Sequence, residues 1–176
     1  MADVRYEKLS GPQAGDVIPD LVDLYANVYA EPPYQEGPEQ VRRFADKLPA
    51  ELDNPGFTLT RALEADRLVG AAYGWTMPAG RWFSRAEHDP PPEIKEAAKL
   101  AVMEWIVHPA YRGQGIGRGL IRLLLADRTE PWAVLASDPR SDARGMYERA
   151  GWQQCGRSVL PWGPAMHLLT LPLPLR

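Results

Sequence analysis

The chain has 176 residues, 45% of them hydrophobic, and a formal charge of −3, which fits one globular domain over residues 1–176 with a substantial core. The slightly acidic balance argues against nucleic acid as a partner. No apolar run is long enough to cross a membrane or to form a signal peptide, so we expect a cytoplasmic protein without a membrane partner.

The first half of the chain predicts a strand, two helices and a hairpin. Alternation over residues 4–9 predicts the strand, and apolar residues at helical spacing predict helices over 16–29 and 39–48. Two further strands are expected over 57–65 and 68–77, joined by a short turn at Asp66-Arg67.

The second half begins with an aperiodic segment. Residues 78–93 predict a long loop, which in a compact domain is often functional or mobile, and 93–99 predict a short helical turn. The remaining elements are a strand at 131–137, a helix at 141–150 closed by Gly151, and a strand pair at 152–160 and 165–171 around Pro161-Trp162-Gly163-Pro164.

Residues 101–128 are the most informative stretch. Residues 101–107 are apolar and rich in Val, Ile and Trp, as in a buried strand, and His108-Pro109 ends the strand. The glycines of 112–117 allow positive φ and close approach to a ligand, and helical spacing follows over 118–128. A helix start after such a turn offers N–H groups to a phosphate, although a plain connecting turn would have the same pattern.

The pattern R-x-x-G-x-G after a strand ending V-x-P-x-Y resembles the GNAT superfamily of acyl-CoA-dependent N-acyltransferases. It matches neither the G-x-G-x-x-G fingerprint nor a P-loop. The resemblance is most specific over residues 100–152. It implies the order βααβββαβαββ and an α/β (α+β) fold with a mixed, mostly antiparallel central sheet of about seven strands and helices on both faces.

The resemblance implies acetyl-CoA as co-substrate. Pantetheine would pair with Ile106 and Val107, where the central strand splays from its neighbour. Arg140 stands where many members have a cofactor-binding asparagine, so an ionic contact is expected there instead. The diphosphate would lie on the backbone of Arg112, Gly113, Gln114, Gly115, Ile116, Gly117 and Arg118.

Two residues are candidate catalytic groups. Tyr147 lies in a segment that resembles the family's Y-E-x-x-G-F, and a phenol of pKa about 10 could protonate the leaving thiolate. Its alternative role is to pack its ring on the helix. Glu104, a carboxylate in an apolar strand, could deprotonate the acceptor ammonium, or it could pair with Arg61 or face solvent.

The acceptor site is less defined. Trp82 and Phe83 either face the substrate or cover the core, while Glu31, Glu36 and Asp89 could bind an ammonium group. Cys155, the single cysteine, is expected to be a small core residue and not a nucleophile. With one cysteine and three scattered histidines, no metal site is expected.

The sequence therefore predicts an N-acetyltransferase that transfers acetyl from acetyl-CoA directly to a primary amine, with a small amine favoured. A catalytically inactive CoA-binding or regulatory protein of the same fold is the alternative. Polyamines, aminoglycosides, amino acids and protein amines all stay open as acceptors. Many members of the family form homodimers, and the apolar tail at 167–175 is a candidate interface.

Overall fold

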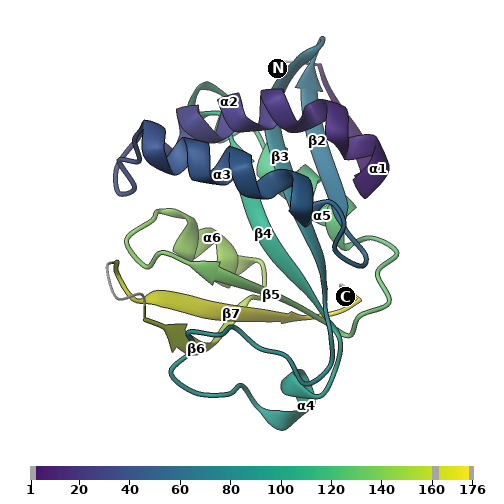
Figure 1. Cartoon of the computed structure of the whole chain (residues 1–176), viewed down its shortest axis with the longest axis vertical. Helices are drawn as coiled ribbons and strands as arrows, with labels where there is room; N and C mark the ends of the chain where they lie inside the picture. The colour runs from purple at the N-terminus through teal and green to yellow at the C-terminus, as the bar shows by residue number, and fades with distance from the viewer. Residues whose placement is uncertain (1–2, 160–162, 175–176) are drawn as a thin grey trace. The chain divides into compact units, whose positions relative to one another are not determined.

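The computed structural model describes residues 3–159 and 163–174 (Figure 1). Its strands are β1 (Val4–Ser10), β2 (Thr58–Glu64), β3 (Arg67–Met77), β4 (Lys99–Val107), β5 (Trp132–Ser137), β6 (Gln153–Ser158) and β7 (Met166–Pro172). Its α-helices are α1 (Gly11–Ala14), α2 (Ile18–Tyr29), α3 (Pro38–Glu51), α4 (Pro92–Lys95), α5 (Ile116–Leu125) and α6 (Ala143–Arg149). Two 3-10 helices are η1 (Gly15–Val17) and η2 (Pro109–Tyr111).

The strands are hydrogen-bonded in the order β1-β2-β3-β4-β5-β7-β6. β4 and β5 pair in parallel, whereas β1 with β2, β2 with β3, β5 with β7 and β6 with β7 pair antiparallel. The mixed, mostly antiparallel sheet of seven strands confirms the expected fold class and the order of its main elements.

The chain divides into two compact units. The first unit contains the described residues up to 75 together with 104–126, and the second contains 76–103 and the described residues from 127 onward. β3 and β4 each begin in one unit and end in the other, and the units are described separately below.

In the first unit, α2 and α3 cover one face of the strands and α5 covers the other (Figure 1). The Tyr73 hydroxyl of β3 donates to Glu51 of α3 at 2.9 Å. On the opposite face, the Thr60 hydroxyl of β2 donates to the Leu120 carbonyl of α5 at 3.1 Å. The expected placement of helices on both faces is therefore confirmed for this unit.

α5 packs closely on β3 because residue 70 is a glycine. A Cβ at Gly70 would lie 2.9 Å from Cδ1 of Leu120 and 3.1 Å from Cγ2 of Ile116. The apolar face of α5 is buried, and its buried residues recur at helical spacing: Ile116, Leu120, Ile121, Leu124 and Leu125. This packing sets where α5 begins, directly after the glycine-rich turn.

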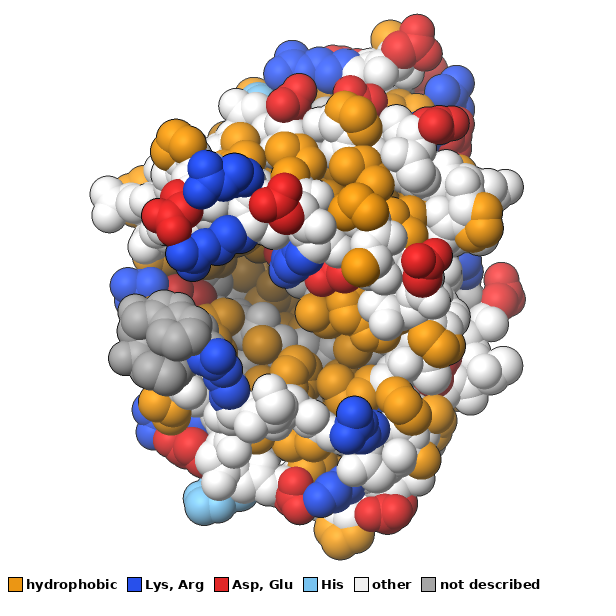
Figure 2. Space-filling view, in the orientation of Figure 1, with side chains coloured by type: hydrophobic (Ala, Val, Ile, Leu, Met, Phe, Trp, Pro, Cys, Tyr) orange, Lys and Arg blue, Asp and Glu red, His pale blue; other side chains and the backbone are white. Residues whose placement is uncertain are grey.

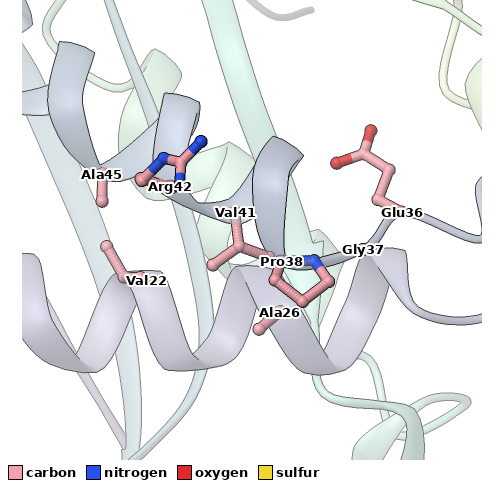
Figure 3. A pocket seen from close by; sticks show the side chains of 8 residues that line it. All are labelled: Val22, Ala26, Glu36, Gly37, Pro38, Val41, Arg42 and Ala45. Atoms are coloured by element: carbon pink, nitrogen blue, oxygen red, sulfur yellow. The ribbon is translucent and has the colours of Figure 1, made fainter.

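α2 and α3 also enclose a shallow groove on their outer side, with a volume of about 480 Å³. Figure 2 shows hydrophobic side chains among charged ones over these helices, and in Figure 3 Val22 of α2 and Ala45 of α3 point toward one another. Among the candidate site residues, only Glu36 lines this groove.

In the second unit, Lys99 fixes the start of β4 to the segment before it. Its side chain is fully buried, and its ammonium donates to the carbonyls of Ile94, Lys95 and Ala97 at 3.2, 2.9 and 2.7 Å. The N–H of Gly80 donates to the same Lys95 carbonyl at 2.8 Å, which ties the long loop to α4.

Most expected elements agree with the structure to within a few residues. Helix α1 was not predicted, because Gly11, Pro12 and Gly15 favour a turn in the sequence. The helix expected over 16–29 begins as η1, and its α-helical part starts at Ile18. The hairpin turn lies one residue earlier than expected, at Ala65-Asp66, because Arg67 already belongs to β3. The expected turn around Pro161-Trp162-Gly163-Pro164 and the tail end at Leu175 include residues outside those described.

Candidate functional site

The segment that follows β4 has the geometry expected of a glycine-rich anion-binding turn. The N–H of His108 donates to the Val69 carbonyl of β3 at 2.9 Å, and η2 follows directly. Gly113 and Gly115 then adopt φ values of +77° and +81°. L-residues rarely adopt this conformation, so the turn depends on glycine at these two positions.

The turn leads directly into α5, and its amides lie at the start of the helix. The N–H of Gly119 donates to the Gly115 carbonyl at 3.1 Å and is the first to close a helical turn. Within the described residues, the backbone N–H groups of 114–118 have no protein acceptor. These amides stand at the positive end of the α5 dipole, an arrangement suited to a phosphate.

Gly117 has a different role from Gly113 and Gly115. It lies inside α5, and a Cβ there would meet Nε1 of Trp105 at 3.3 Å and Cγ2 of Val107 at 3.6 Å. The Trp105 indole N–H also donates to the Gly117 carbonyl at 2.9 Å. Glycine at 117 therefore lets the start of α5 pack on β4, and a larger residue would displace the amides indirectly.

The side chains of the turn contribute unequally. Ile116 is buried in the core, so only its backbone can meet a ligand. Arg118 is exposed, and Arg112 pairs with Glu31 at 2.7 Å, with both side chains close to half exposed. An exposed pair of this kind is weak and can exchange for a phosphate.

Glu104 is half-buried in β4 and receives a hydrogen bond from α2. The Tyr29 hydroxyl donates to its Oε2 at 2.6 Å. Burial raises the pKa of Glu104 to about 7, against the lowering effects of Tyr29 and Lys47. A carboxyl with such a pKa near neutrality has the properties of a general base. The alternative partner, Arg61, instead bonds Glu7 at 2.5 Å.

Tyr25 and Glu36 form a second tyrosine–carboxylate pair in the first unit. The Tyr25 hydroxyl donates to Glu36 at 2.5 Å, so Glu36 has a partner within the protein. Tyr25 stacks on Phe44 with ring centroids 3.9 Å apart. Burial, and then the hydrogen bond to Glu36, raise the pKa of Tyr25 well above its usual range. Tyr25 is therefore a donor at neutral pH.

In the second unit, the Tyr147 ring meets Trp152 edge to face, with centroids 6.4 Å apart. Trp152 is buried, so this contact orients the tyrosine ring. The Arg140 guanidinium donates to both carboxylate oxygens of Asp138, at 3.0 and 2.7 Å, and the Arg140 backbone N–H donates to Oδ1 at 2.9 Å. Arg140 is half exposed at 52%, and its guanidinium lowers the pKa of Asp138.

Trp82 and Phe83 pack against the core of the second unit. Their rings meet at 5.1 Å, and both lie on a cluster of Ile94, Ala101 and Val134. This favours the core-covering role. The Trp82 Nε1 is nevertheless buried without a hydrogen-bond partner among the described residues. Asp89, a further candidate for an ammonium site, pairs with Lys95 of α4.

Cys155 is poorly suited to act as a nucleophile. Burial raises the pKa of its thiol, which favours the unreactive protonated form. Its Sγ lies 3.5 Å from the Leu168 carbonyl on β7.

Across residues 3–159 and 163–174, no group of three or more His, Cys, Asp or Glu side chains could hold a metal ion. In the same residues, no helix is long and apolar enough to span a membrane.

The sequence prediction missed the partners that hold these groups. The sequence places Tyr29 only within an expected helix and Trp105 only within an expected strand. The spacing of Tyr25 and Tyr29, four residues apart on a helix, places both rings on one face and was the available signal. No sequence pattern linked that face to Glu104.

Comparisons with known proteins agree with this geometry. A family model described as acetyltransferase (GNAT) family matches residues 19–152. No curated protein matches the chain. The solved paia N-acetyltransferase from Thermoplasma acidophilum, in complex with coenzyme A, has a TM-score of 0.62 at 13% identity, covering 97% of this chain and 99% of that one.

Two other solved structures act on different acceptors. The ribosomal-protein-S18-alanine N-acetyltransferase from Escherichia coli has a TM-score of 0.62 at 14% identity, covering 96% and 93% of the two chains. An aminoglycoside acetyltransferase from an uncultured soil metagenomic sample, in complex with sisomicin, has a TM-score of 0.56 at 16% identity, covering 92% and 95%. At these identities the likeness shows the fold alone. The family match spans most of the sequence, and the chain therefore belongs to the acetyltransferase (GNAT) family.

Proposed function

We propose that the protein is an N-acetyltransferase that transfers the acetyl group of acetyl-CoA directly to a primary amine, with a small amine favoured as acceptor. The family match supports the reaction class. The observation that carries the proposal for this chain is the turn with positive φ at Gly113 and Gly115, together with the amides of 114–118, which have no acceptor in the part of the protein that the structure describes. Those amides would bind the diphosphate of the cofactor.

The residues of β4 would position the rest of the cofactor. The parallel ladder between β4 and β5 comprises only Lys99–Ala101 with Trp132–Val134. A ladder this short supports the expected divergence of β4 beyond it, where the backbone of Ile106 and Val107 would pair with pantetheine. An N–H there would also stabilise the negative charge that develops on the thioester oxygen.

Two side chains would move the protons. The Glu104 carboxylate would take a proton from the acceptor ammonium, leaving a neutral amine that forms the new bond to the acetyl carbon. The carbon–sulfur bond then breaks, and the Tyr147 phenol would give its proton to the leaving thiolate. The amide nitrogen would release its second proton to water, and the phenolate would regain a proton from water, which leaves a neutral amide, a free thiol and an intact phenol. A carboxyl with a pKa of about 7 can take a proton near neutral pH, and phenols in general hold a proton that they can give to a thiolate.

Calorimetric titration with CoA tests the cofactor site. Gly115→Val forces a β-branched residue into φ +81°, and we expect CoA affinity to fall by about tenfold or more, equivalent to about 1.4 kcal/mol. Gly80→Val is the matched control, because Gly80 has φ +77° and open space around it but lies outside the turn. Unchanged affinity in Gly115→Val would refute the assignment.

Thiol release tests the activity and the acceptor. Spermidine, kanamycin, free lysine and a peptide with an N-terminal alanine represent the acceptor classes that stay open. Turnover with spermidine would support a small cationic amine. CoA binding without thiol release from any of the four would favour the alternative, a CoA-binding or regulatory protein of the same fold.

A further inference from the structure

Glu104 is held from one side only. Its Oε2 accepts from the Tyr29 hydroxyl at 2.6 Å, across 75 positions of sequence. Within the described residues, Oε1 has no hydrogen-bond partner, although the side chain is partly buried. The two carboxylate oxygens are therefore distinct: one is fixed by the protein, and the other is available to a ligand.

Tyr29 is itself fixed by aromatic packing. Its ring lies 4.4 Å from the Tyr25 ring and meets the Tyr34 ring edge to face at 4.7 Å. Tyr25 in turn stacks on Phe44. Burial and the charge of Glu104 raise the pKa of Tyr29 well above its usual value, so its hydroxyl keeps its proton and acts only as a donor.

We propose that Tyr29 is a positioning residue for Glu104, which orients the carboxylate so that Oε1 faces the acceptor amine. This rests on the proposed function, in which Glu104 is the base. Ammonium and carboxylate become amine and carboxylic acid, with the proton passing to Oε1 while Oε2 keeps its bond to Tyr29. Of the interactions that favour the ionised form of Glu104, the Tyr29 hydrogen bond is the strongest.

Other groups also face Glu104 and set its ionisation. Lys47 of α3 favours the charged form, whereas Glu36 before α3 and Glu51 of α3 oppose it. The charge of Glu104 in turn contributes to the raised pKa of Tyr25 on α2 and of Tyr73 on β3, so both phenols keep their protons and carry no charge that would act on Glu104. Removing only the Tyr29 hydroxyl leaves all of these groups in place.

Tyr29→Phe is the test, because it keeps the ring and removes the hydrogen bond. We expect the acid limb of the pH profile of kcat/KM to move up by about one pH unit, so that kcat/KM on the acidic side falls about tenfold. Tyr25→Phe is the matched control one turn earlier on α2. Its hydroxyl bonds Glu36, so the acid limb should stay where it is.

A second measurement does not depend on turnover. In protein labelled with ¹³C at the glutamate carboxyls, the Glu104 resonance is identified by its loss in Glu104→Gln, and its titration is followed in the parent and in Tyr29→Phe. The proposal is supported if the pKa of the Glu104 carboxyl is higher in Tyr29→Phe than in the parent. The acid limb of kcat/KM, measured with spermidine or another active amine, should then move up by the same amount.

Two results would overturn the proposal, and they differ in meaning. An unchanged carboxyl titration in Tyr29→Phe would show that the hydroxyl does not act on Glu104, whatever the activity. A carboxyl titration that moves while the acid limb stays would show that Glu104 is not the base, although acetyl transfer itself would stand. Absence of turnover with every amine refutes the proposed function instead, and the carboxyl titration still decides whether Tyr29 holds Glu104.

Discussion

Glu104 should make the protein less stable as the pH rises through neutrality. Its pKa lies at about 7 in the folded protein, compared with an ordinary value of 4.5, because burial disfavours the charged form. The folded protein therefore binds this proton more tightly than the unfolded chain does. Between pH 4.5 and 7 the folded state still holds a proton that the unfolded chain has already lost. The free energy of unfolding therefore falls as the pH rises through this range.

The size of the effect follows from the two pKa values. The interval between 4.5 and about 7 corresponds to about 3.4 kcal/mol at 1.36 kcal/mol per pH unit. Of this, about 2.5 kcal/mol is lost between pH 5 and pH 8.5, because part of the loss occurs below pH 5. Glu104→Gln removes the titration while keeping an oxygen that can accept from Tyr29. We therefore expect the free energy of unfolding of Glu104→Gln, measured relative to that of the parent, to rise by about 2.5 kcal/mol from pH 5 to pH 8.5.

Urea unfolding at pH 5, 6, 7 and 8.5, with both proteins at the same ionic strength, measures this difference. Glu7→Gln is the matched control. Arg61 lowers the pKa of Glu7, so the stability that Glu7 contributes is present above its unfolded value of 4.5 and is lost only below it. The free energy of unfolding of Glu7→Gln should therefore differ from that of the parent by a constant amount from pH 5 to 8.5. A constant difference between Glu104→Gln and the parent would refute the raised pKa and, with it, the main physical argument for a base at this position.

Three other changes test single contacts. Lys99→Met should lower the free energy of unfolding in urea by about 3 kcal/mol, because three backbone carbonyls lose their buried donor; a loss below 1 kcal/mol would contradict this. Gly70→Ala should cost about 1–3 kcal/mol in the same assay, since its Cβ would lie 2.9 Å from Leu120. Tyr147→Phe should reduce kcat about tenfold or more while Tm stays within about 2 °C, because the ring contact with Trp152 is kept; full activity would mean that the hydroxyl gives no proton.

The main elements could be predicted because each depends on short-range patterns. α2 buries Leu21, Leu24, Tyr25 and Val28, which recur at helical spacing in the sequence. The turn after β4 was predictable for a similar reason, since Gly113 and Gly115 adopt the positive φ that glycine favours. Such signals need no knowledge of distant segments.

Partners across long sequence separations could not be predicted in this way. Arg61 was a reasonable partner for Glu104 on charge alone, but the register of β1 and β2 places it directly opposite Glu7. Glu31 and Glu36 stay candidates for an acceptor ammonium, but their partners in the fold, Arg112 and Tyr25, have no signal in the sequence. Sheet register and helix docking decide these pairings, and neither is encoded in the local pattern.

Glu104 is a position at which the apolar pattern of a buried strand does not predict the residue. A partly buried carboxylate in an otherwise apolar strand opposes the local pattern, and an apolar residue would avoid the cost of burial. Burial alone would favour the protonated carboxyl, which cannot take a further proton. A strong donor alone would keep it ionised but weakly basic. Burial on one side and the Tyr29 hydroxyl on the other leave a carboxyl that is partly ionised and still basic near pH 7, the condition that a general base requires.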